Sequence, residues 1–236
     1  MKNYKLATLC GDAVDAESGA EGLKGIRAAL GHYTRLLLYG SIFRWVGTKR
    51  GEISALFGAI AVVDVLFGDA WPMDPFRPNS SPRFWIFWSL FLAGIAVRIW
   101  AAGILNKCKE VTRIGIYRLV RHPLYLGTLL IYLSFFLGLG NILLGGPLLF
   151  LMTLIIYYPR ILHEEKLLLR KFPSAYRQYA GLTPRLIPRL SLLSAAFRDG
   201  GFSMQKSYQN LGVKSLSGIA LLPFLLVGLI MIKERF

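Results

Sequence analysis

The chain has 236 residues, of which 54% are hydrophobic and only 17% are charged. A soluble domain usually carries about 25% charged residues, so this chain has too little polar surface for a water-soluble globule of its size. Lys and Arg number 28 against 13 Asp and Glu. Because anionic lipid headgroups and the positive-inside rule account for that excess, we exclude a nucleic-acid-binding function and expect a membrane protein.

Five apolar segments are candidates for membrane spans, since a helix of about 20 residues crosses a hydrocarbon core of roughly 30 Å. They cover residues 53–71, 84–105, 124–139, 142–158 and 216–232. Only Gly140 and Asn141 separate the third segment from the fourth, which predicts a helical hairpin. Asp64 and Arg98 lie inside the first two segments, and we expect these charges to pair across helices, as buried ionisable groups in membranes usually do.

Basic residues are concentrated in two of the segments that connect these spans. Residues 106–123 carry five Lys or Arg against Glu110, and residues 159–215 carry ten against three acidic residues. Short cytoplasmic loops are the ones rich in Lys and Arg, so both segments are predicted to be cytoplasmic. The sequence therefore predicts an all-α, polytopic membrane bundle of about five spans, with its N-terminus inside and its C-terminus outside.

The other parts of the chain have weaker patterns. Residues 33–46 are apolar but only about 14 long, so we expect an interfacial or re-entrant helix there. No cleavable signal peptide is expected, because the first 22 residues mix basic and acidic side chains. Cys10 and Cys108 form no CxxC motif and the three histidines are dispersed, so neither a disulfide framework nor a metal site is expected.

The first basic segment ends in the sequence RHP, residues 121–123. Proline suits the first turn of a helix, so we expect a helix to begin at His122 or Pro123. Its free N–H groups and positive dipole end would face the cytoplasmic interface and suit an anionic group such as a carboxylate. Gly127 leaves room for a flat ligand or for another helix. The alternative is that the arginines only set the topology and the tyrosines form an interfacial aromatic belt.

The second basic segment begins as a helix that leaves the membrane, and it carries the adjacent acids Glu164 and Glu165. Acidic residues contribute little to topology, so a carboxylate pair beside the interface is a candidate for function. The alternative is a surface network in which this pair only binds Arg160 and Lys166. The hairpin should bring the Glu pair and the RHP sequence to one water-facing rim.

These motifs, in this order, resemble the isoprenylcysteine carboxyl methyltransferase and phospholipid methyltransferase superfamily of integral membrane enzymes. The resemblance covers about residues 84–190. It rests on the sequence GIYRLVRHPLYLG at 115–127, the apolar hairpin, the Glu pair and the sequence TPRLIP at 183–188. Pro173 departs from the family pattern, which commonly has Gly after the preceding Phe.

The resemblance implies an S-adenosylmethionine (SAM) pocket at the cytoplasmic face, closed in part by the C-terminal cytoplasmic segment. A lipid or prenylated substrate would enter from the bilayer. The cofactor-binding residues that the resemblance implies are Tyr117, His122, Leu124, Tyr125, Leu126, Gly127, Glu164, Glu165, Tyr176, Tyr179 and Arg185. The residues expected to act in catalysis are Arg121, Arg160 and Glu165.

The chain would then comprise an N-terminal tail with an interfacial helix (1–52), two spans (53–105), a catalytic core (106–190) and a linker with the last span (191–236). The favoured activity is SAM-dependent methyl transfer to a lipidic carboxylate such as that of a prenylated cysteine, because arginines near the hairpin could orient it. A phospholipid amine, with one Glu as base, is the alternative acceptor. An NADPH-dependent membrane reductase and a non-catalytic membrane scaffold stay open.

Overall fold

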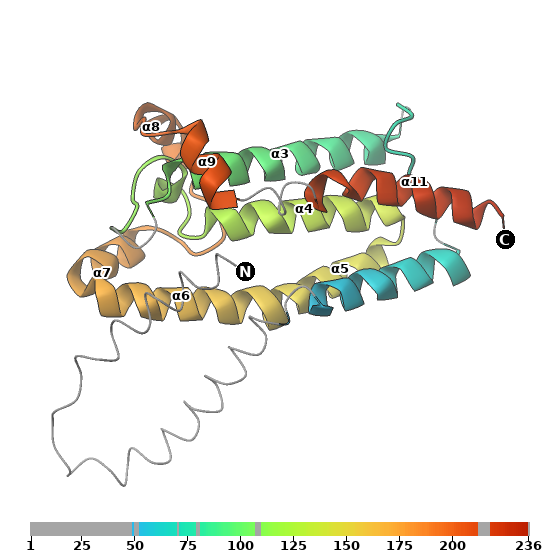
Figure 1. Ribbon diagram of the computed structural model, residues 1–236, viewed down its shortest axis with the longest axis horizontal. Helices are drawn as coiled ribbons and strands as arrows, with labels where there is room; N and C mark the ends of the chain where they lie inside the picture. Colours follow the sequence, from blue (N-terminus) through green and yellow to red (C-terminus); the bar gives the residue numbers. More distant parts are fainter. Residues whose placement is uncertain are drawn as a thin grey trace, which may run out of the picture.

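The computed structural model describes residues 49, 52–69, 71–78, 81–106, 110–211 and 218–235. Within these ranges every regular element is a helix, and the long helices lie side by side in a bundle (Figure 1). The predicted all-α class is therefore confirmed for this part of the chain. The interfacial helix predicted over residues 33–46, and both cysteines, fall outside it.

Each of the five predicted spans contains a helix. In chain order these are a helix over residues 52–67, α3 (Pro82–Ile104), α4 (Pro123–Leu139), the continuous helix Ile142–Lys171 and the helix Gly218–Lys233, whose main part is α11 (Leu222–Lys233). Only α3, with 23 residues, and Ile142–Lys171, with 30, are both long and apolar enough to cross a membrane among the described residues. The five-span topology therefore stays a prediction.

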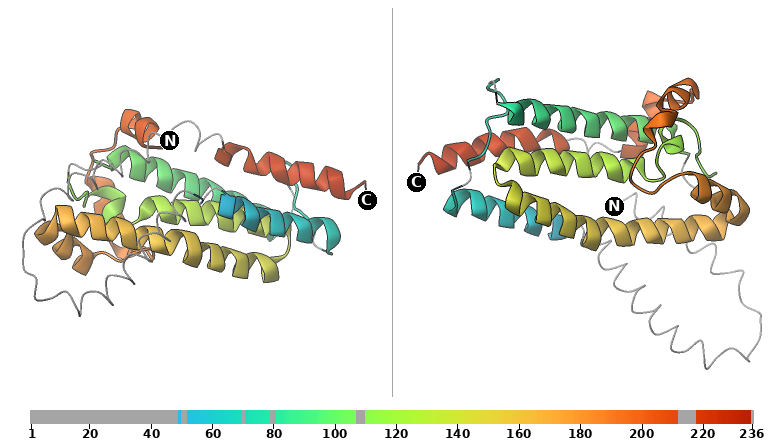
Figure 2. Two further views of the ribbon diagram at one scale, coloured as in Figure 1. Left: turned by 60° about the horizontal axis from the view of Figure 1, so that its bottom comes forward. Right: turned by 180° about the vertical axis from the view of Figure 1, so that it is seen from behind.

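The continuous helix has three parts, and short helices follow it. The parts are α5 (Ile142–Met152), a π-helical turn η2 (Thr153–Tyr157) and α6 (Tyr158–Lys171). The short elements are η1 (Gly115–Arg118), α7 (Pro173–Leu182), η3 (Leu190–Leu192), α8 (Leu193–Arg198) and α9 (Met204–Leu211). The two views of Figure 2 show α7, α8 and α9 gathered at one end of the bundle and the C-terminus at the other.

Two glycines set the close approach of α3 and α4. A Cβ atom added at Gly94 would lie 2.7 Å from the Gly127 carbonyl oxygen, and one added at Gly127 would lie 2.7 Å from the Gly94 carbonyl oxygen. Small residues let helix backbones approach in this way. Of the two roles expected for Gly127, the structure therefore favours the close approach of another helix over room for a ligand.

The hairpin turn is fixed at the end of the bundle that holds the C-terminus. Gly140 has φ +98, and the Asn141 side chain accepts a hydrogen bond from the Leu144 N–H at 3.2 Å. The Asn141 amide also donates to Asp64 at 3.0 Å.

Arg98 lies near the other end of α3 and donates to the Leu124 carbonyl and the Thr128 hydroxyl. The predicted Asp64–Arg98 pair is therefore wrong, because the two charges sit at different depths in the bundle.

The two basic segments meet at the end opposite the hairpin turn. Backbone N–H groups of Arg121 and His122 donate to the carbonyls of Pro184 and Arg185, at 2.8 and 3.2 Å. The Arg189 N–H likewise donates to the Leu119 carbonyl at 3.0 Å. The segment between α7 and η3 thus runs alongside the residues that precede α4, and both predicted cytoplasmic segments occupy one end of the bundle.

We predict that Gly94→Ala lowers the free energy of unfolding by about 1–3 kcal/mol, because the new methyl group would overlap α4. Gly146→Ala is the matched control, since a Cβ atom there meets nothing within 4 Å. That variant should be neutral or stabilised by roughly 0.5–1 kcal/mol. Thermal unfolding of the detergent-solubilised protein measures both, and equal midpoints for the two variants would contradict the tight α3–α4 packing.

Candidate functional site

Glu165 lies at the centre of a buried ionic cluster, and only 6% of the residue is exposed. Its carboxylate accepts hydrogen bonds from Arg121 at 2.9 Å and from Arg185 at 3.0 Å, and it lies 3.4 Å from Nε2 of His122. Cations and hydrogen-bond donors around a carboxylate favour its ionised form. Glu165 therefore acts here as a fixed anion that joins α6, the start of α4 and the segment after α7.

The local sequence explains why His122 is part of this cluster. His122 is the residue before the first helical position of α4, and Pro123 occupies that first position, as predicted from the RHP sequence. The His122 backbone N–H donates to the Arg185 carbonyl, and only 6% of His122 is exposed. The expected water-facing rim is therefore wrong for His122 and Glu165, because the segment after α7 folds over them.

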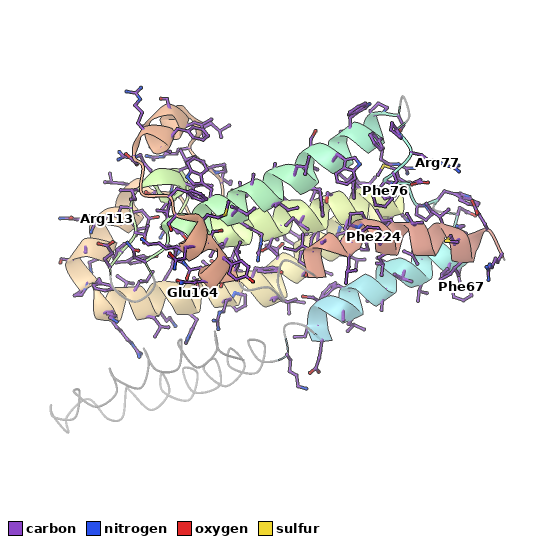
Figure 3. The ribbon with its side chains drawn as sticks, turned by 45° about the horizontal axis from the view of Figure 1, so that its top comes forward. Phe67, Phe76, Arg77, Arg113, Glu164 and Phe224 are labelled. Carbon is purple, nitrogen blue, oxygen red and sulfur yellow. The ribbon has the colours of Figure 1, made fainter. Side chains whose placement is uncertain are left out.

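Glu164 is the more accessible of the two acids. Its carboxylate accepts a hydrogen bond from the Tyr125 hydroxyl at 2.6 Å and lies 3.5 Å from Nε of Arg160. Its side chain is 37% exposed, against 8% for that of Glu165. The surface network considered as the alternative is thus present for Glu164 and Arg160, whereas Glu165 binds residues from other segments. Figure 3 labels Glu164 at the end of the bundle opposite Phe67 and Phe76.

Aromatic side chains continue from Glu164 along the hairpin. The Tyr125 ring centroid lies 5.8 Å from that of Tyr157, which lies 6.5 Å from that of Tyr132. Tyr157 was not among the predicted site residues. It ends the π-helical turn η2, and such turns are frequent at functional sites. The only signal for it in the sequence is Pro159, which lacks the N–H that would donate to the Ile155 carbonyl in a regular helix.

Nε of Arg121 and the hydroxyl of Tyr176 are buried beside Glu165 and make no hydrogen bond of good geometry with the described residues, although Arg121 and Glu165 lie close enough to the hydroxyl to act on its pKa. Burial and the negative charge of Glu165 raise the pKa of Tyr176 to about 12. This hydroxyl is therefore protonated at neutral pH and is available as a donor. Buried polar atoms without a well-formed hydrogen bond are unusual in folded proteins, so these two atoms are candidates to bind a polar ligand.

The other predicted site residues lie around this cluster. The Tyr179 hydroxyl donates to the Tyr117 carbonyl at 2.7 Å and fastens α7 to η1. The N–H groups of Tyr125 and Leu126 both bind the His122 carbonyl at 3.1 Å, so the helix start keeps fewer free donors than expected. Arginine and tyrosine side chains are therefore the main donors left for an anionic ligand.

The cluster residues lie mostly within a segment that matches a family model. Residues 82–175 match the family model described as phospholipid methyltransferase, which confirms the predicted resemblance and indicates a membrane methyltransferase. The match includes the RHP sequence and the Glu pair, whereas Tyr176, Tyr179 and Arg185 lie beyond it. No curated protein and no solved structure matches the chain. In the part of the chain that the structure describes, no group of three or more His, Cys, Asp or Glu residues could hold a metal ion.

We predict that Glu165→Gln lowers the free energy of unfolding by about 3 kcal/mol, because it leaves the largely buried Arg121 without its counter-ion and removes the ion pair of the half-exposed Arg185. The matched control is Lys166→Gln, at an exposed position on the same helix, which should change stability by less than about 0.5 kcal/mol. Thermal or denaturant unfolding in detergent distinguishes the two. A Glu165→Gln protein as stable as the control would show that the cluster contributes nothing to folding.

Proposed function

We propose that this protein is an integral membrane enzyme that uses SAM to methylate the headgroup of a lipid at its cytoplasmic face. The observation that carries this proposal is that the hairpin and the segment after α7 bring His122 and both glutamates together at one end of the bundle. These residues lie within the segment that matches the phospholipid methyltransferase family.

The residues of the cluster fit the chemistry of SAM. SAM carries a carboxylate and an ammonium, and when bound it supplies an electrophilic methyl group from its sulfonium. Nε of Arg121 and the Tyr176 hydroxyl are buried donors without a hydrogen bond of good geometry among the described residues, which suits the carboxylate. The faces of the Tyr125 and Tyr157 rings suit a cation close to Glu164.

Methyl transfer needs alignment and exclusion of water more than covalent help from the protein. Glu165 supports both, because its ion pairs hold the start of α4 against α6 and the segment after α7. The aromatic row of Tyr125, Tyr157 and Tyr132 excludes water along the hairpin. A lipid anchored by its tails in the bilayer would present its headgroup beside these rings.

The ion pairs favour an amine over a carboxylate as the methyl acceptor. An excess of arginines would favour a carboxylate, but Arg121 and Arg185 bind Glu165, and Arg118 binds Asp199. Glu164 remains as an accessible carboxylate, and it would take the proton that a headgroup ammonium loses before its nitrogen attacks the methyl group. The family match agrees with this choice of acceptor.

We predict that S-adenosylhomocysteine stabilises the purified protein by about 2.7 kcal/mol at a hundred times its dissociation constant. Tyr176→Phe should weaken that affinity, because it removes one of these two buried donors and leaves the ring in place. Arg170→Gln, at an exposed position on α6, is the control and should bind as the wild type does. Stabilisation by NADPH instead would favour the reductase, and stabilisation by neither ligand would favour the scaffold.

The acceptor class is tested by incubating the protein with methyl-labelled SAM and total membrane lipids. An amine acceptor predicts label in a headgroup that resists mild base, and Glu164→Gln should lose that labelling while it still folds. Label released by base as methanol would show a methyl ester and would overturn the choice of an amine. The unfolding midpoint of the Glu164→Gln protein serves as the control for folding.

A further inference from the structure

A hollow lies beside the Glu165 cluster, and we call it the arginine groove. It has a volume of about 570 Å³, within the usual range for small-molecule sites. Residues from and beside η1, the end of α7 and the segment that leads into η3 line it, with Arg113, Arg118 and Arg189 as its charged members. None of the described residues that line it is acidic. Arg113 is labelled in Figure 3, at the same end of the bundle as Glu164.

Two of the three arginines are held in place by the protein. Arg118 makes two hydrogen bonds to the Asp199 carboxylate, both of 2.9 Å, and the hydrogen bond from Arg118 lowers the pKa of Asp199. Arg113 donates to the Ala175 carbonyl at 2.7 Å. Each of these contacts leaves further N–H groups of the guanidinium for a ligand. One acid beside three arginines leaves the groove with an excess of positive charge.

Apolar side chains accompany the arginines. Ile114, Leu182 and Leu192 line the same groove, and Leu182 is 68% exposed. Beyond it, Ile187 and Leu190 are 81% and 68% exposed. A groove that combines guanidinium groups with exposed aliphatic side chains matches an amphiphile better than it matches a fully polar anion.

We propose that the arginine groove, which Tyr179 also lines, binds the phosphate group of an anionic phospholipid from the cytoplasmic leaflet, at a site that adjoins that of methyl transfer. The planar guanidinium fork matches phosphate oxygens in pairs. Anionic lipids are concentrated in the cytoplasmic leaflet, the side on which the basic segments are predicted to lie. The aliphatic side chains at the groove would contact the glycerol and the first acyl carbons.

Binding there would act on the methyl-transfer site through the backbone. A phosphate held by Arg113 and Arg189 would join η1 to the segment after α7. Arg185 lies four residues before Arg189 in that segment, and it binds Glu165. An anionic lipid should therefore stabilise the segment that covers the Glu165 cluster.

The test uses the full chain purified in a neutral detergent, with its unfolding midpoint as the measured quantity. Phosphatidylglycerol should raise the midpoint in a saturable manner by about 5 °C or more at a hundred times its dissociation constant. Phosphatidylcholine, whose net charge is zero, should have little effect. The double variant Arg113→Gln/Arg189→Gln should unfold near the wild-type temperature without lipid and lose the shift, whereas Arg170→Gln keeps it.

Three results would overturn the proposal. An equal shift with glycerol 3-phosphate would show that the groove takes a soluble phosphate and not a lipid. An equal loss of the shift in Arg170→Gln would show attraction to the net charge of the protein without a site. A shift retained in the double variant would place the lipid elsewhere. None of these readouts depends on methyl transfer, so the outcome is independent of the proposed function.

Discussion

The ion pairs of Glu165 are the interaction on which this end of the molecule depends. They join two arginines to one buried carboxylate. Arg121 lies 44 positions before Glu165 in the chain, and Arg185 lies 20 positions after it. Taking such charges out of water is costly, and it is tolerated only where the geometry and the hydrogen bonds are good. In return, the ion pairs fix the positions of the start of α4, the helix α6 and the segment after α7 relative to one another. Apolar contacts are not directional and would fix these polar segments less well.

The helix lengths explain why the cluster forms where it does. The helix after the hairpin turn has 30 residues and α4 has 17, so the returning helix is 13 residues longer. At 1.5 Å per residue it extends well beyond the start of α4. Its polar last part, α6, thus stands next to the RHP sequence, and the chain can turn at Phe172 and Pro173 and fold back over both.

Much of this arrangement follows from the sequence, because hydropathy and turn residues report on local structure. The features predicted in this way are the helices, the hairpin at Gly140 and the helix start after His122. The predicted pairing of Asp64 with Arg98 is wrong because it considers only that both charges lie in spans and not how deep in the bundle each one lies. Since the first two spans run in opposite directions, Asp64 near the end of one and Arg98 near the end of the next lie at opposite faces of the bundle.

What the sequence could not provide is the state of each charge after folding. The excess of arginine in the sequence predicts a positively charged site. In the structure, however, Arg121 and Arg185 form ion pairs with Glu165, and Arg118 forms one with Asp199. The polar side chains near the hairpin are Glu164, which Tyr125 and Arg160 contact, and the tyrosines, and these groups suit a cationic headgroup. The uncompensated positive charge lies instead in the arginine groove. The fold thus places an acidic group and an arginine-lined groove at one end of the bundle, which are the counter-charges that the proposed lipid amine and lipid phosphate require.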